Sequence, residues 1–467
     1  MPRNLTVAAL GDVVRIDLSR LTDADAHAVE AAWRDAPASA DAAVAPTGDP
    51  HPDDSPSVTA LADVSREVML SDLSQRVTLA AIRHARGRLW MLHAAGVALE
   101  DGRVVVLVGP SGRGKTTAAR TLGRTYGYVS DETVAIAPGG SIHPYRKPLS
   151  VIERPDAPKI QLAPSELSLR PLPDVPLRLA AIVLLDRRPD AGDEPLVEPV
   201  DLGDALTEIV AQTSYLPSLP QPLRTLAAHV AAAGGIRRVI YREAESLVPL
   251  IPLLADAAVP GPAPREAATA DRRTTAVRGP VYARTFADDA IDLDDPERIA
   301  LLHVDGAGKG TVRVIAGVAP ALWRAAGGAS IEQLTDAAVE AHGHPASGDP
   351  RVAVAAAAAE LVEAGVLSYA DRPRWRISDA VAWVDSGDRA VVLDLEGGGG
   401  APLALEDSAA LIWFAVAEGA ASGGGRTTDE VVAHVAAEAE TDAVAVEPDV
   451  VAFLGELLTR GWIVPGT

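Results

Sequence analysis

Several common features are missing from this sequence, and each absence narrows the possible functions. The chain of 467 residues has no cysteine, which excludes disulfide bonds, thiolate metal sites and a cysteine nucleophile. Its formal net charge of −22 argues against a surface for duplex nucleic acid, which needs clustered Lys and Arg. No apolar run approaches the roughly 20 residues of a membrane span, and residues 1–18 lack the apolar segment of a signal peptide. We therefore expect a cytoplasmic protein that binds neither nucleic acid nor membrane.

A glycine-rich stretch carries the clearest chemical pattern. The apolar residues 104–108 predict a buried strand. They lead into Gly109-Pro-Ser-Gly-Arg-Gly-Lys-Thr116, a full match to the phosphate-binding pattern G-x-x-x-x-G-K-[ST], and residues 117–122 predict a helix. In this context, backbone N–H groups and a helix N-terminus surround an anion. We predict that nucleotide phosphates bind to the following residues: Gly109, Ser111, Gly112, Arg113, Gly114, Lys115, Thr116 and Thr117.

Two of these side chains have specific roles in the prediction. Lys115 would contact the β- and γ-phosphates, and the Thr116 hydroxyl would bind Mg²⁺. The alternative is a glycine-rich turn without a special role, which the surrounding strand and helix patterns disfavour.

The residues on either side of the loop indicate where catalysis would occur. Residues 90–108, interrupted by an Asp-Gly pair, predict two antiparallel strands joined by a tight turn. Asp131 follows the predicted helix at a spacing that lets the chain return to a neighbouring strand end. Phosphoryl transfer requires a carboxylate that orients or deprotonates the acceptor, so Asp131 is a candidate general base. Glu132 would bind Mg²⁺ or support Asp131. A solvated turn at residues 130–132 is the alternative.

Residues 92–134 resemble the HPr serine kinase/phosphorylase family, whose relatives share a fold with phosphoenolpyruvate carboxykinases. The family has a histidine-bearing strand, a loop of the form G-x-S-G-x-G-K-[ST] and an acidic pair after the following helix. These features match His93, residues 109–116, Asp131 and Glu132. The resemblance implies an ATP- or GTP-dependent serine kinase that uses Mg²⁺, with His93 in a catalytic role near the reacting phosphate. A histidine with a structural role is the alternative.

Two departures from the family limit what the resemblance implies. Both acidic positions are Asp in the family, whereas the second is Glu132 here. The Glu-x-Arg-Gly segment that HPr kinases carry after the acidic pair is not evident. Its absence argues against HPr itself as the acceptor and against a phosphorylase reaction.

Three further polar residues are candidates for the same site. Arg146 and Lys147 follow a likely strand and would meet nucleotide phosphates or an acidic partner, or would form a solvated basic turn. Asp186 ends an apolar strand, residues 179–185, in the manner of a Walker B segment, and would bind Mg²⁺. A strand that ends in Asp is also a common structural feature.

The patterns predict a modular chain. An α/β (α+β) P-loop domain of the HPr kinase/phosphoenolpyruvate carboxykinase type is expected at residues 86–256, after an accessory region at residues 1–85. Residues 257–280 are rich in Pro, Gly and Ala without periodicity and predict a linker. Two small winged-helix-like α+β domains are expected to follow, at residues 281–372 and 376–467.

These two C-terminal segments repeat one pattern. Trp323 and Trp413 lie at matching positions in an apolar helix, and a capping-box helix start follows each of them, Ser330-x-x-Gln333 and Thr427-x-x-Glu430. A long helix that ends in a glycine and an apolar strand completes each repeat. The pattern resembles the PqqD-like family, whose modules bind the leader of a ribosomally made precursor peptide. A winged helix that reads DNA is the alternative, but the capped helices are acidic.

The sequence therefore supports two hypotheses of different classes. The first is an ATP-dependent kinase whose PqqD-like modules recruit a precursor peptide or protein, which the P-loop domain phosphorylates on a hydroxyl. The second is a non-catalytic adaptor, in which nucleotide binding gates a peptide-binding chaperone for other peptide-modifying enzymes. The candidate base Asp131 favours the first, because an adaptor has no use for it. An ATP-responsive transcription regulator is a weaker third reading.

Overall fold

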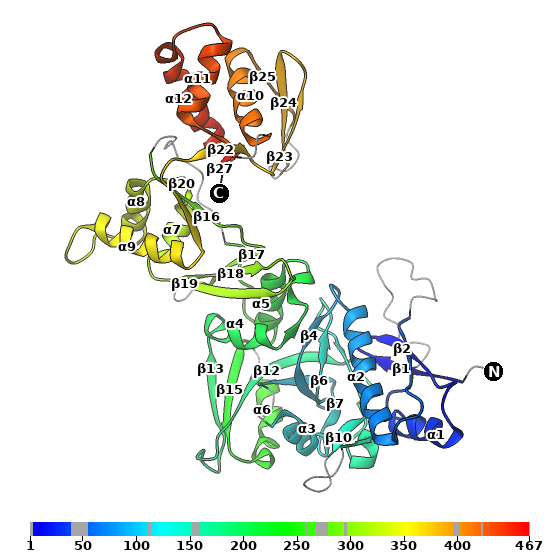
Figure 1. The fold of residues 1–467 in the computed structure, drawn as a ribbon. Helices are drawn as coiled ribbons and strands as arrows, with labels where there is room; N and C mark the ends of the chain where they lie inside the picture. The colour runs from blue at the N-terminus through cyan, green and yellow to red at the C-terminus, as the bar shows by residue number, and fades with distance from the viewer. Residues whose placement is uncertain are drawn as a thin grey trace. The chain divides into compact units, whose positions relative to one another are not determined.

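The computed structural model describes the following residues: 3–38, 55–110, 114–151, 159–257, 259–267, 279–293, 297–395, 401–421 and 424–466. The chain divides into two compact units (Figure 1). The first comprises Met1–Glu266, Asp288–Leu293 and Ala300–Val314; the second comprises Ala267–Ala287, Asp294–Ile299 and Ile315–Thr467. Both units mix helices and strands, as the sequence predicts. Residues 258 and 268–278 of the expected linker lie outside the described residues.

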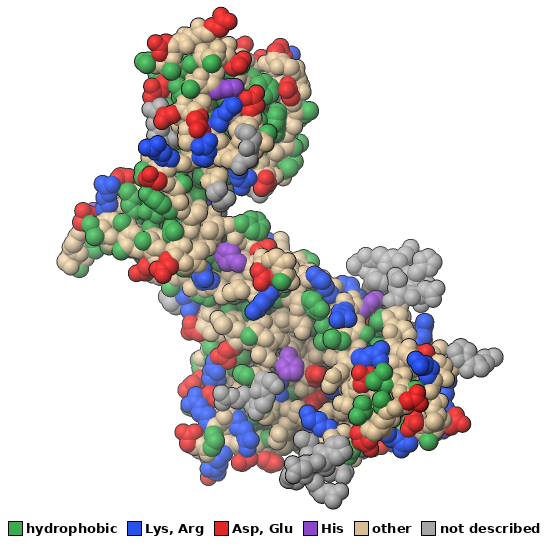
Figure 2. Space-filling view, viewed as in Figure 1, with side chains coloured by type: hydrophobic (Ala, Val, Ile, Leu, Met, Phe, Trp, Pro, Cys, Tyr) green, Lys and Arg blue, Asp and Glu red, His purple; other side chains and the backbone are tan. Residues whose placement is uncertain are grey.

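The described surface carries charges of both signs. In Figure 2, Lys and Arg side chains are interspersed with Asp and Glu over the visible face, so the described atoms of this face form no continuous basic surface of the kind that duplex nucleic acid requires. Within the described ranges, no helix has the length and apolar character needed to cross a membrane.

The N-terminal region forms a small layer of its own. Its elements are β1 (Asn4–Ala9), β2 (Asp12–Asp17), α1 (Asp23–Ala32), β3 (Ser57–Thr59) and α2 (Arg66–His84), with the strands in the order β1-β2-β3. The apolar core of this layer continues into the neighbouring domain, because it also contains Met91, Ala135 and Tyr145. The buried hydroxyls of Thr78 and Tyr145 lie 2.8 Å apart and share a hydrogen bond. The N-terminal region is therefore packed onto the P-loop domain.

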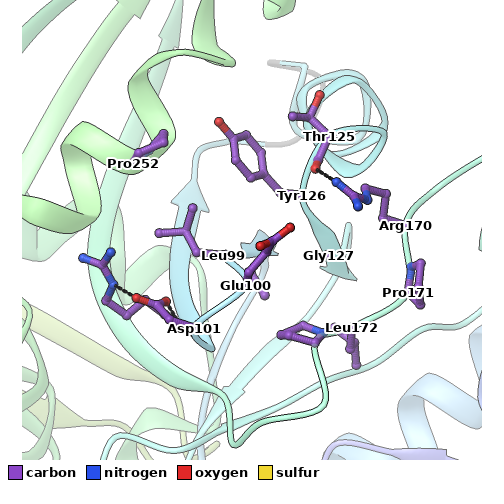
Figure 3. A pocket seen from close by; sticks show the side chains of 13 residues that line it. Leu99, Glu100, Asp101, Thr125, Tyr126, Gly127, Arg170, Pro171, Leu172 and Pro252 are labelled. Carbon is purple, nitrogen blue, oxygen red and sulfur yellow. Dashed lines mark hydrogen bonds and ion pairs between the residues drawn. The ribbon is translucent and has the colours of Figure 1, made fainter.

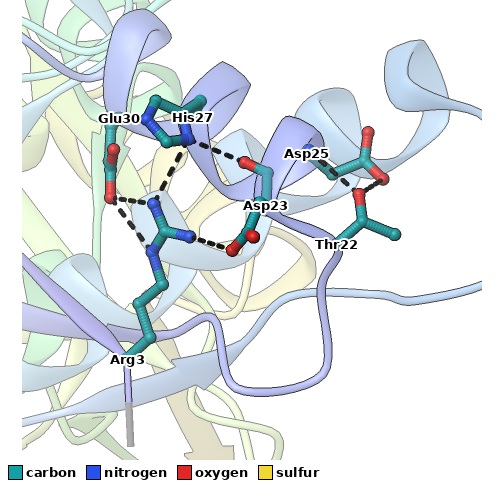
Figure 4. A network of polar contacts seen from close by, with 6 residues as sticks. All are labelled: Arg3, Thr22, Asp23, Asp25, His27 and Glu30. Atoms are coloured by element: carbon teal, nitrogen blue, oxygen red, sulfur yellow. Dashed lines mark hydrogen bonds and ion pairs between the residues drawn. The ribbon is translucent and has the colours of Figure 1, made fainter.

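An ion-pair network fixes the start of β1 against α1 (Figure 4). The Arg3 guanidinium lies 3.1 Å from the Asp23 carboxylate and 2.9 Å from that of Glu30. At the start of α1, the Thr22 hydroxyl accepts a hydrogen bond from the backbone N–H of Asp25 at 3.2 Å, which satisfies one of the free N–H groups of the helix. The network joins the first residues of the chain to the first helix.

The central six-stranded sheet has the order β13-β15-β12-β6-β5-β7. Its strand β6 alternates between two apolar cores: Val104, Val106 and Val108 face one core, and Val105 and Leu107 face the other. Helices α4 and α5 cover the first face, and α3 and α6 cover the second (Figure 1). The strands of the sheet are β5 (Ala94–Ala98), β6 (Arg103–Val108), β7 (Gly127–Ser130), β12 (Arg178–Arg187), β13 (Leu196–Val200) and β15 (Ile236–Tyr241), and the helices are α3 (Lys115–Gly123), α4 (Leu202–Ala211), α5 (Pro222–Ala232) and α6 (Leu250–Asp256).

The predicted hairpin before the P-loop is confirmed. Strand β5 pairs antiparallel with β6, and the tight turn between them contains Gly102, whose φ of 84° lies in the left-handed region. A Cβ atom at Gly102 would come within 2.3 Å of the Pro176 carbonyl oxygen, so only glycine fits there. The other neighbour of β6 is β12, which runs parallel to it. The P-loop strand thus lies between one antiparallel and one parallel partner.

A second sheet contains the strand that comes just before β5. The segment expected as one strand over residues 90–99 is divided at His93 into β4 and β5, which belong to different sheets. The second sheet has the order β14-β4-β8-β9. Its strands, and the remaining short elements of the domain, are β4 (Trp90–Leu92), β8 (Val134–Ile136), β9 (Ile142–His143), β14 (Thr213–Ser214), β10 (Leu149–Val151), β11 (Ile160–Leu162), η1 (Pro164–Leu167), η2 (Leu216–Ser218) and η3 (Ala244–Leu247).

A three-stranded sheet from the first repeat belongs to the same compact unit as the P-loop domain. It contains β17 (Asp289–Leu293), β18 (Arg298–Val304) and β19 (Gly310–Ala316), in that order. Four of its buried side chains share one core with α4 and α5: Ile291, Leu293, Ala300 and Leu302. The sequence places this sheet in a separate domain at residues 281–372, whereas the structure packs it onto α5.

The two repeats have the same order of elements. In each, a three-stranded sheet precedes three helices, and a second small sheet joins strands before and after the helices. The remaining elements of the first repeat are β16 (Val281–Arg284), α7 (Ala319–Ala325), β20 (Gly327–Ala329), α8 (Ile331–His342), α9 (Pro350–Glu363) and β21 (Leu367–Ala370). Those of the second are β22 (Arg374–Ile377), β23 (Val381–Asp385), β24 (Arg389–Asp394), β25 (Leu403–Glu406), α10 (Asp407–Ala421), β26 (Arg426–Thr427), α11 (Thr428–Glu438), α12 (Ala443–Thr459) and β27 (Ile463–Pro465).

Both predicted capping boxes are present. The Ser330 hydroxyl accepts from the Gln333 N–H while the Gln333 side chain accepts from the Ser330 N–H, and Thr427 and Glu430 do the same in the second repeat. The second repeat has a core of its own, in which every member lies between Trp375 and Ile463.

This difference between the repeats leads to a prediction about fragments. A fragment of residues 373–467 should fold cooperatively as a monomer, because its core is complete. A fragment of residues 279–467 should self-associate and should not unfold cooperatively. Without α5, the apolar side of the β17-β18-β19 sheet becomes exposed in this fragment. Thermal unfolding by circular dichroism and size-exclusion chromatography measure both properties. A monomeric, cooperatively melting 279–467 fragment would show that the first repeat does not depend on the P-loop domain.

Candidate active site

A polar cavity of about 490 Å³ opens where the P-loop helix begins. It contains the three predicted catalytic residues, Asp131, His93 and Lys115, and it is lined by these and by Gly114, Thr116, Thr117, Glu132, Lys147, Ser150 and Lys159. Residues that are distant in sequence therefore meet at one place. The predicted ligands Ser111, Gly112 and Arg113 lie outside the described residues.

The pairing of β5 explains this meeting. Ala94 at the start of β5 pairs with Val108 at the end of β6, so His93 lies beside the point where the P-loop begins. Strand β7 is antiparallel to β5, and its last residue Ser130 pairs with Gly96, so Asp131 emerges at the same edge. The end of β6, the start of β5 and the end of β7 thus coincide.

The loop presents a helix N-terminus to the cavity. Gly114 has a φ of 92°, a left-handed conformation that glycine adopts without steric cost, and α3 begins at the next residue. The Lys115 ammonium donates hydrogen bonds to the carbonyl oxygens of Gly109 at 2.6 Å and Pro110 at 3.3 Å. Burial lowers the pKa of Lys115, and the nearby Asp131 carboxylate opposes this shift. The side chain is only 5% exposed.

Asp131 is held in a buried and well-defined position. It is 8% exposed, and its carboxylate accepts a hydrogen bond of 2.8 Å from the hydroxyl of Tyr128, which is fully buried. Burial, reinforced by the Asp131 charge, raises the pKa of Tyr128 well above its usual value, so the phenol stays protonated and remains a donor. The Ser130 hydroxyl accepts from the N–H groups of Glu132 and Thr133 and fixes the turn. The alternative of a solvated turn does not hold for Asp131.

His93 occupies the junction between the two sheets. Its backbone N–H donates to the carbonyl oxygen of Gln212 at 2.7 Å, outside both strand ladders. Burial lowers the pKa of the imidazole, the positive charge of Lys115 lowers it further, and the Glu132 carboxylate partly opposes both effects. The lowered pKa favours the neutral ring at pH 7, and a neutral imidazole can accept a proton.

Of the predicted basic pair, only Lys147 reaches the cavity. Its ammonium lies 3.0 Å from the Glu132 carboxylate, and its side chain is only 8% exposed. Arg146 is used elsewhere: it donates to the carbonyl oxygens of Tyr128 and Arg170, and its guanidinium lies over the Tyr128 ring. One residue of the pair therefore faces the cavity, and the other supports the fold.

The positions of the few lysines in the sequence also indicate functional residues. Of the 42 Lys and Arg residues of the chain, only four are Lys. Three of them line this cavity: Lys115, Lys147 and Lys159. Lysine offers a compact, strongly hydrated point charge for phosphate, whereas arginine offers a planar fork. The scarcity of lysine elsewhere therefore marks Lys147 and Lys159 as functional candidates. No pattern in the sequence indicates a role for Tyr128, because its hydrogen bond to Asp131 depends on the turn after β7.

The structure does not bring Asp186 into the cavity. Its carboxylate accepts two hydrogen bonds from Arg188, at 2.9 and 2.6 Å, and the residue is not among those that line the site. Within the described ranges, no group of three or more acidic or histidine side chains could hold a metal by itself. Mg²⁺ is usually bound by one or two protein groups together with substrate phosphates. Thr116 and Glu132 remain candidate ligands.

A larger cavity, of about 670 Å³, lies at the opposite end of the same strands (Figure 3). It is bordered by the turn that joins β5 and β6 and by the start of β7. The Arg103 guanidinium there lies 2.6 Å from each of the Asp101 and Asp256 carboxylates, and Arg170 donates to the Thr125 carbonyl oxygen. These charges are used within the protein, so size alone does not make this cavity a site.

Comparison with known proteins finds a match to one family model and to several solved structures, including the following two. Residues 389–463 match the family described as coenzyme PQQ synthesis protein D (PqqD). The structure of TbiB1 in complex with the TbiA(beta) leader peptide is 30% identical with a TM-score of 0.17, over 19% of this chain and 93% of that chain. The HPr(Ser) kinase/phosphatase from Coxiella burnetii is 14% identical with a TM-score of 0.19, over 36% of this chain and 93% of that chain. The curated proteins include no match.

The second repeat therefore contains a PqqD domain, as the sequence predicts. The matched residues run from the start of β24 to the start of β27 and include all three helices of the repeat. Membership of the first repeat in the same family stays a prediction.

The contact between Lys147 and Glu132 can be tested through stability. Glu132→Gln should lower the free energy of unfolding by about 1–3 kcal/mol, because it leaves the ammonium of Lys147, which is almost fully buried, without a charged partner. Urea unfolding measures the change. In the double variant Glu132→Gln/Lys147→Met, the loss should be smaller than the sum of the two single losses. Additive losses would show that the two side chains do not interact.

Proposed function

We propose that this protein is a nucleotide-dependent kinase that transfers a phosphoryl group to a hydroxyl of a peptide, and that the PqqD domain recruits this peptide. The observation that carries the proposal is the convergence of Lys115, Asp131 and His93 on one cavity at the N-terminus of α3. A site that only held nucleotide would need Lys115 and the N-terminus of α3, but it would have no use for the buried carboxylate of Asp131 beside them.

The phosphate donor would bind at the start of α3. Backbone N–H groups and the positive end of the helix dipole would contact its β- and γ-phosphates, and the Lys115 ammonium would neutralise charge that develops on them. The residues present fit a nucleoside triphosphate with Mg²⁺, since the Thr116 hydroxyl and the Glu132 carboxylate line the same cavity. Mg²⁺ would supply further neutralisation of the phosphate oxygens.

Asp131 would act on the acceptor. As the bond between the γ-phosphorus and the leaving oxygen breaks, a bond forms to the acceptor oxygen, and the acceptor proton passes to the Asp131 carboxylate. The hydrogen bond from Tyr128 holds one oxygen of this carboxylate in place and leaves the other for the acceptor hydroxyl. The neutral His93 would accept or donate a hydrogen bond at the same phosphate.

The peptide would come from the PqqD domain. TbiB1, whose solved structure contains a leader peptide, provides the precedent for a peptide partner. We infer that the present chain binds an extended segment of a ribosomally made precursor, added as a strand to an exposed sheet edge. A non-catalytic adaptor would bind the same peptide and nucleotide without transferring phosphate, which separates the two candidate functions experimentally.

The first test concerns nucleotide binding. The wild-type protein should bind ATP or GTP in the presence of Mg²⁺, and Lys115→Ala should weaken binding by about tenfold or more, equivalent to roughly 1.4 kcal/mol, because the β- and γ-phosphates lose their cation. Isothermal titration calorimetry measures both affinities. Lys309→Ala, which removes a lysine outside the cavity, is the matched control. Absence of nucleotide binding by the wild-type protein would refute the proposal.

The second test separates catalysis from binding. Asp131→Asn preserves the shape of the side chain but removes its basicity, so the transfer rate should fall by about 10²–10⁴-fold while nucleotide affinity changes little. Transfer from radiolabelled ATP to the precursor peptides encoded beside the gene measures the rate. Asp186→Asn is the control, because that carboxylate pairs with Arg188 outside the cavity. Wild-type turnover in Asp131→Asn would remove this residue from the mechanism; nucleotide and peptide binding without transfer would favour the adaptor.

A further inference from the structure

A second cavity of the first unit, of about 500 Å³, lies beside the β18–β19 hairpin. One wall comes from the P-loop domain, at the end of α4 and in β14 and η2, and contributes Val210, Thr213 and Leu216. The other wall comes from the hairpin and contributes Lys309 and Val312. The cavity therefore combines apolar side chains and three threonines with a single lysine.

The two walls are parts of one packed body. Leu302 of β18 and Leu206 of α4 are fully buried in the same core. The tip of the hairpin is also fixed, because the Asp305 carboxylate accepts hydrogen bonds from the N–H groups of Ala307 and Lys309 at 2.9 and 2.8 Å. This turn sets the place from which the Lys309 side chain extends.

The rim of the cavity is cationic in a strongly acidic protein. Lys309 is the fourth and last lysine of the chain, and it makes no ion pair among the described residues. Arg86 does not line the cavity itself, but its guanidinium lies 5.1 Å from the centre of the ring of the lining residue Tyr215 and donates to the Ser218 hydroxyl. The net charge of the protein is −22, so this rim favours an acidic ligand against the overall field.

The hairpin also favours an extended ligand. In the described sheet, β19 has a strand neighbour on one side only, and Thr311 and Val312 of this strand line the cavity. Alternate residues of an added strand point to opposite sides. A peptide with alternating apolar and acidic residues would place the former against Val210 and Val312 and the latter toward Lys309.

The cavity is connected directly to the candidate active site. Gln212 lies between the lining residues Ala211 and Thr213, and its carbonyl oxygen accepts the hydrogen bond from the His93 N–H. Thr213 itself pairs with Leu92, and its hydroxyl accepts a hydrogen bond from the Trp90 indole at 3.2 Å. One wall of the cavity is thus hydrogen-bonded to the strand that leads into His93.

We propose that this cavity docks an acidic, extended segment of the peptide substrate on the P-loop domain itself. The inference rests on the proposed function, and it adds a second contact to that made by the PqqD domain at residues 389–463. Two linked contacts raise the effective concentration of the acceptor segment at the active site, provided that both can be made by one peptide.

The docking chemistry can be tested with a defined probe on the full-length protein. A fluorescein-labelled hexapeptide of alternating Glu and Val should bind with an affinity that falls with added salt, and a hexapeptide of alternating Lys and Val should not. Lys309→Ala should weaken binding of the acidic probe by about tenfold by removing the rim cation. Ala211→Trp should weaken it by at least as much, because Ala211 is exposed at the cavity and a large side chain there fills it. Fluorescence anisotropy measures all three.

Arg313→Ala is the matched control, because it removes a cation from the same strand outside the cavity and should leave probe binding unchanged. Unchanged probe affinity in both Lys309→Ala and Ala211→Trp, or equal binding of the basic hexapeptide, would overturn the inference. Nucleotide affinity and phosphoryl transfer are measured on the same proteins. If the wild-type protein does not bind nucleotide and does not transfer phosphate, the proposed function fails. If the wild-type protein does both, but the two cavity variants bind the probe as tightly as it does, only the docking inference fails.

Discussion

The antiparallel pairing of β5 with both of its neighbours is the constraint on which the active site depends. Because β5 runs opposite to β6, its first residues lie beside the end of the P-loop strand. Because β7 runs opposite to β5, its last residue lies beside the same point. A parallel arrangement of β5 would place His93 at the far end of the sheet, where the large cavity between Arg103 and Gly127 is found. Strand direction thus decides which end of the sheet carries the chemistry.

Burial gives these residues their chemical character. Lys115 and Asp131 are nearly inaccessible, and the Asp131 carboxylate favours the charged form of Lys115 against the effect of burial on its pKa. Tyr128 must remain a donor to Asp131, and its own burial ensures this by raising its pKa. His93 is kept neutral by burial and by the charge of Lys115. The protonation states of Lys115, Tyr128 and His93 therefore depend on packing at the sheet edge, which links the fold to the proposed reaction.

Local patterns allowed much of this to be predicted. The apolar run before the glycines, the Asp-Gly turn and the capping boxes each depend on a few neighbouring residues, and the structure has all of them. Features that depend on distant residues were not predictable in this way. A strand that ends in an acid gave no information that Arg188 would occupy the Asp186 carboxylate. The segment around Leu302 reads as part of a separate module, and only its packing against α5 assigns it to the P-loop domain.

The division of labour between the two basic residue types adds an independent argument for the assignment of the sites. Arginines in this chain hold the structure together: Arg3 ties β1 to α1, Arg146 supports the Tyr128 backbone, and Arg103 joins the β5–β6 turn to the end of α6. A guanidinium suits these roles, because its fixed fork forms several hydrogen bonds at once and stays charged. The four lysines instead line two cavities, and in each cavity the adjoining backbone reaches His93. Lysine at these positions suits both proposals, because a compact point charge can meet either a phosphate donor or an acidic peptide.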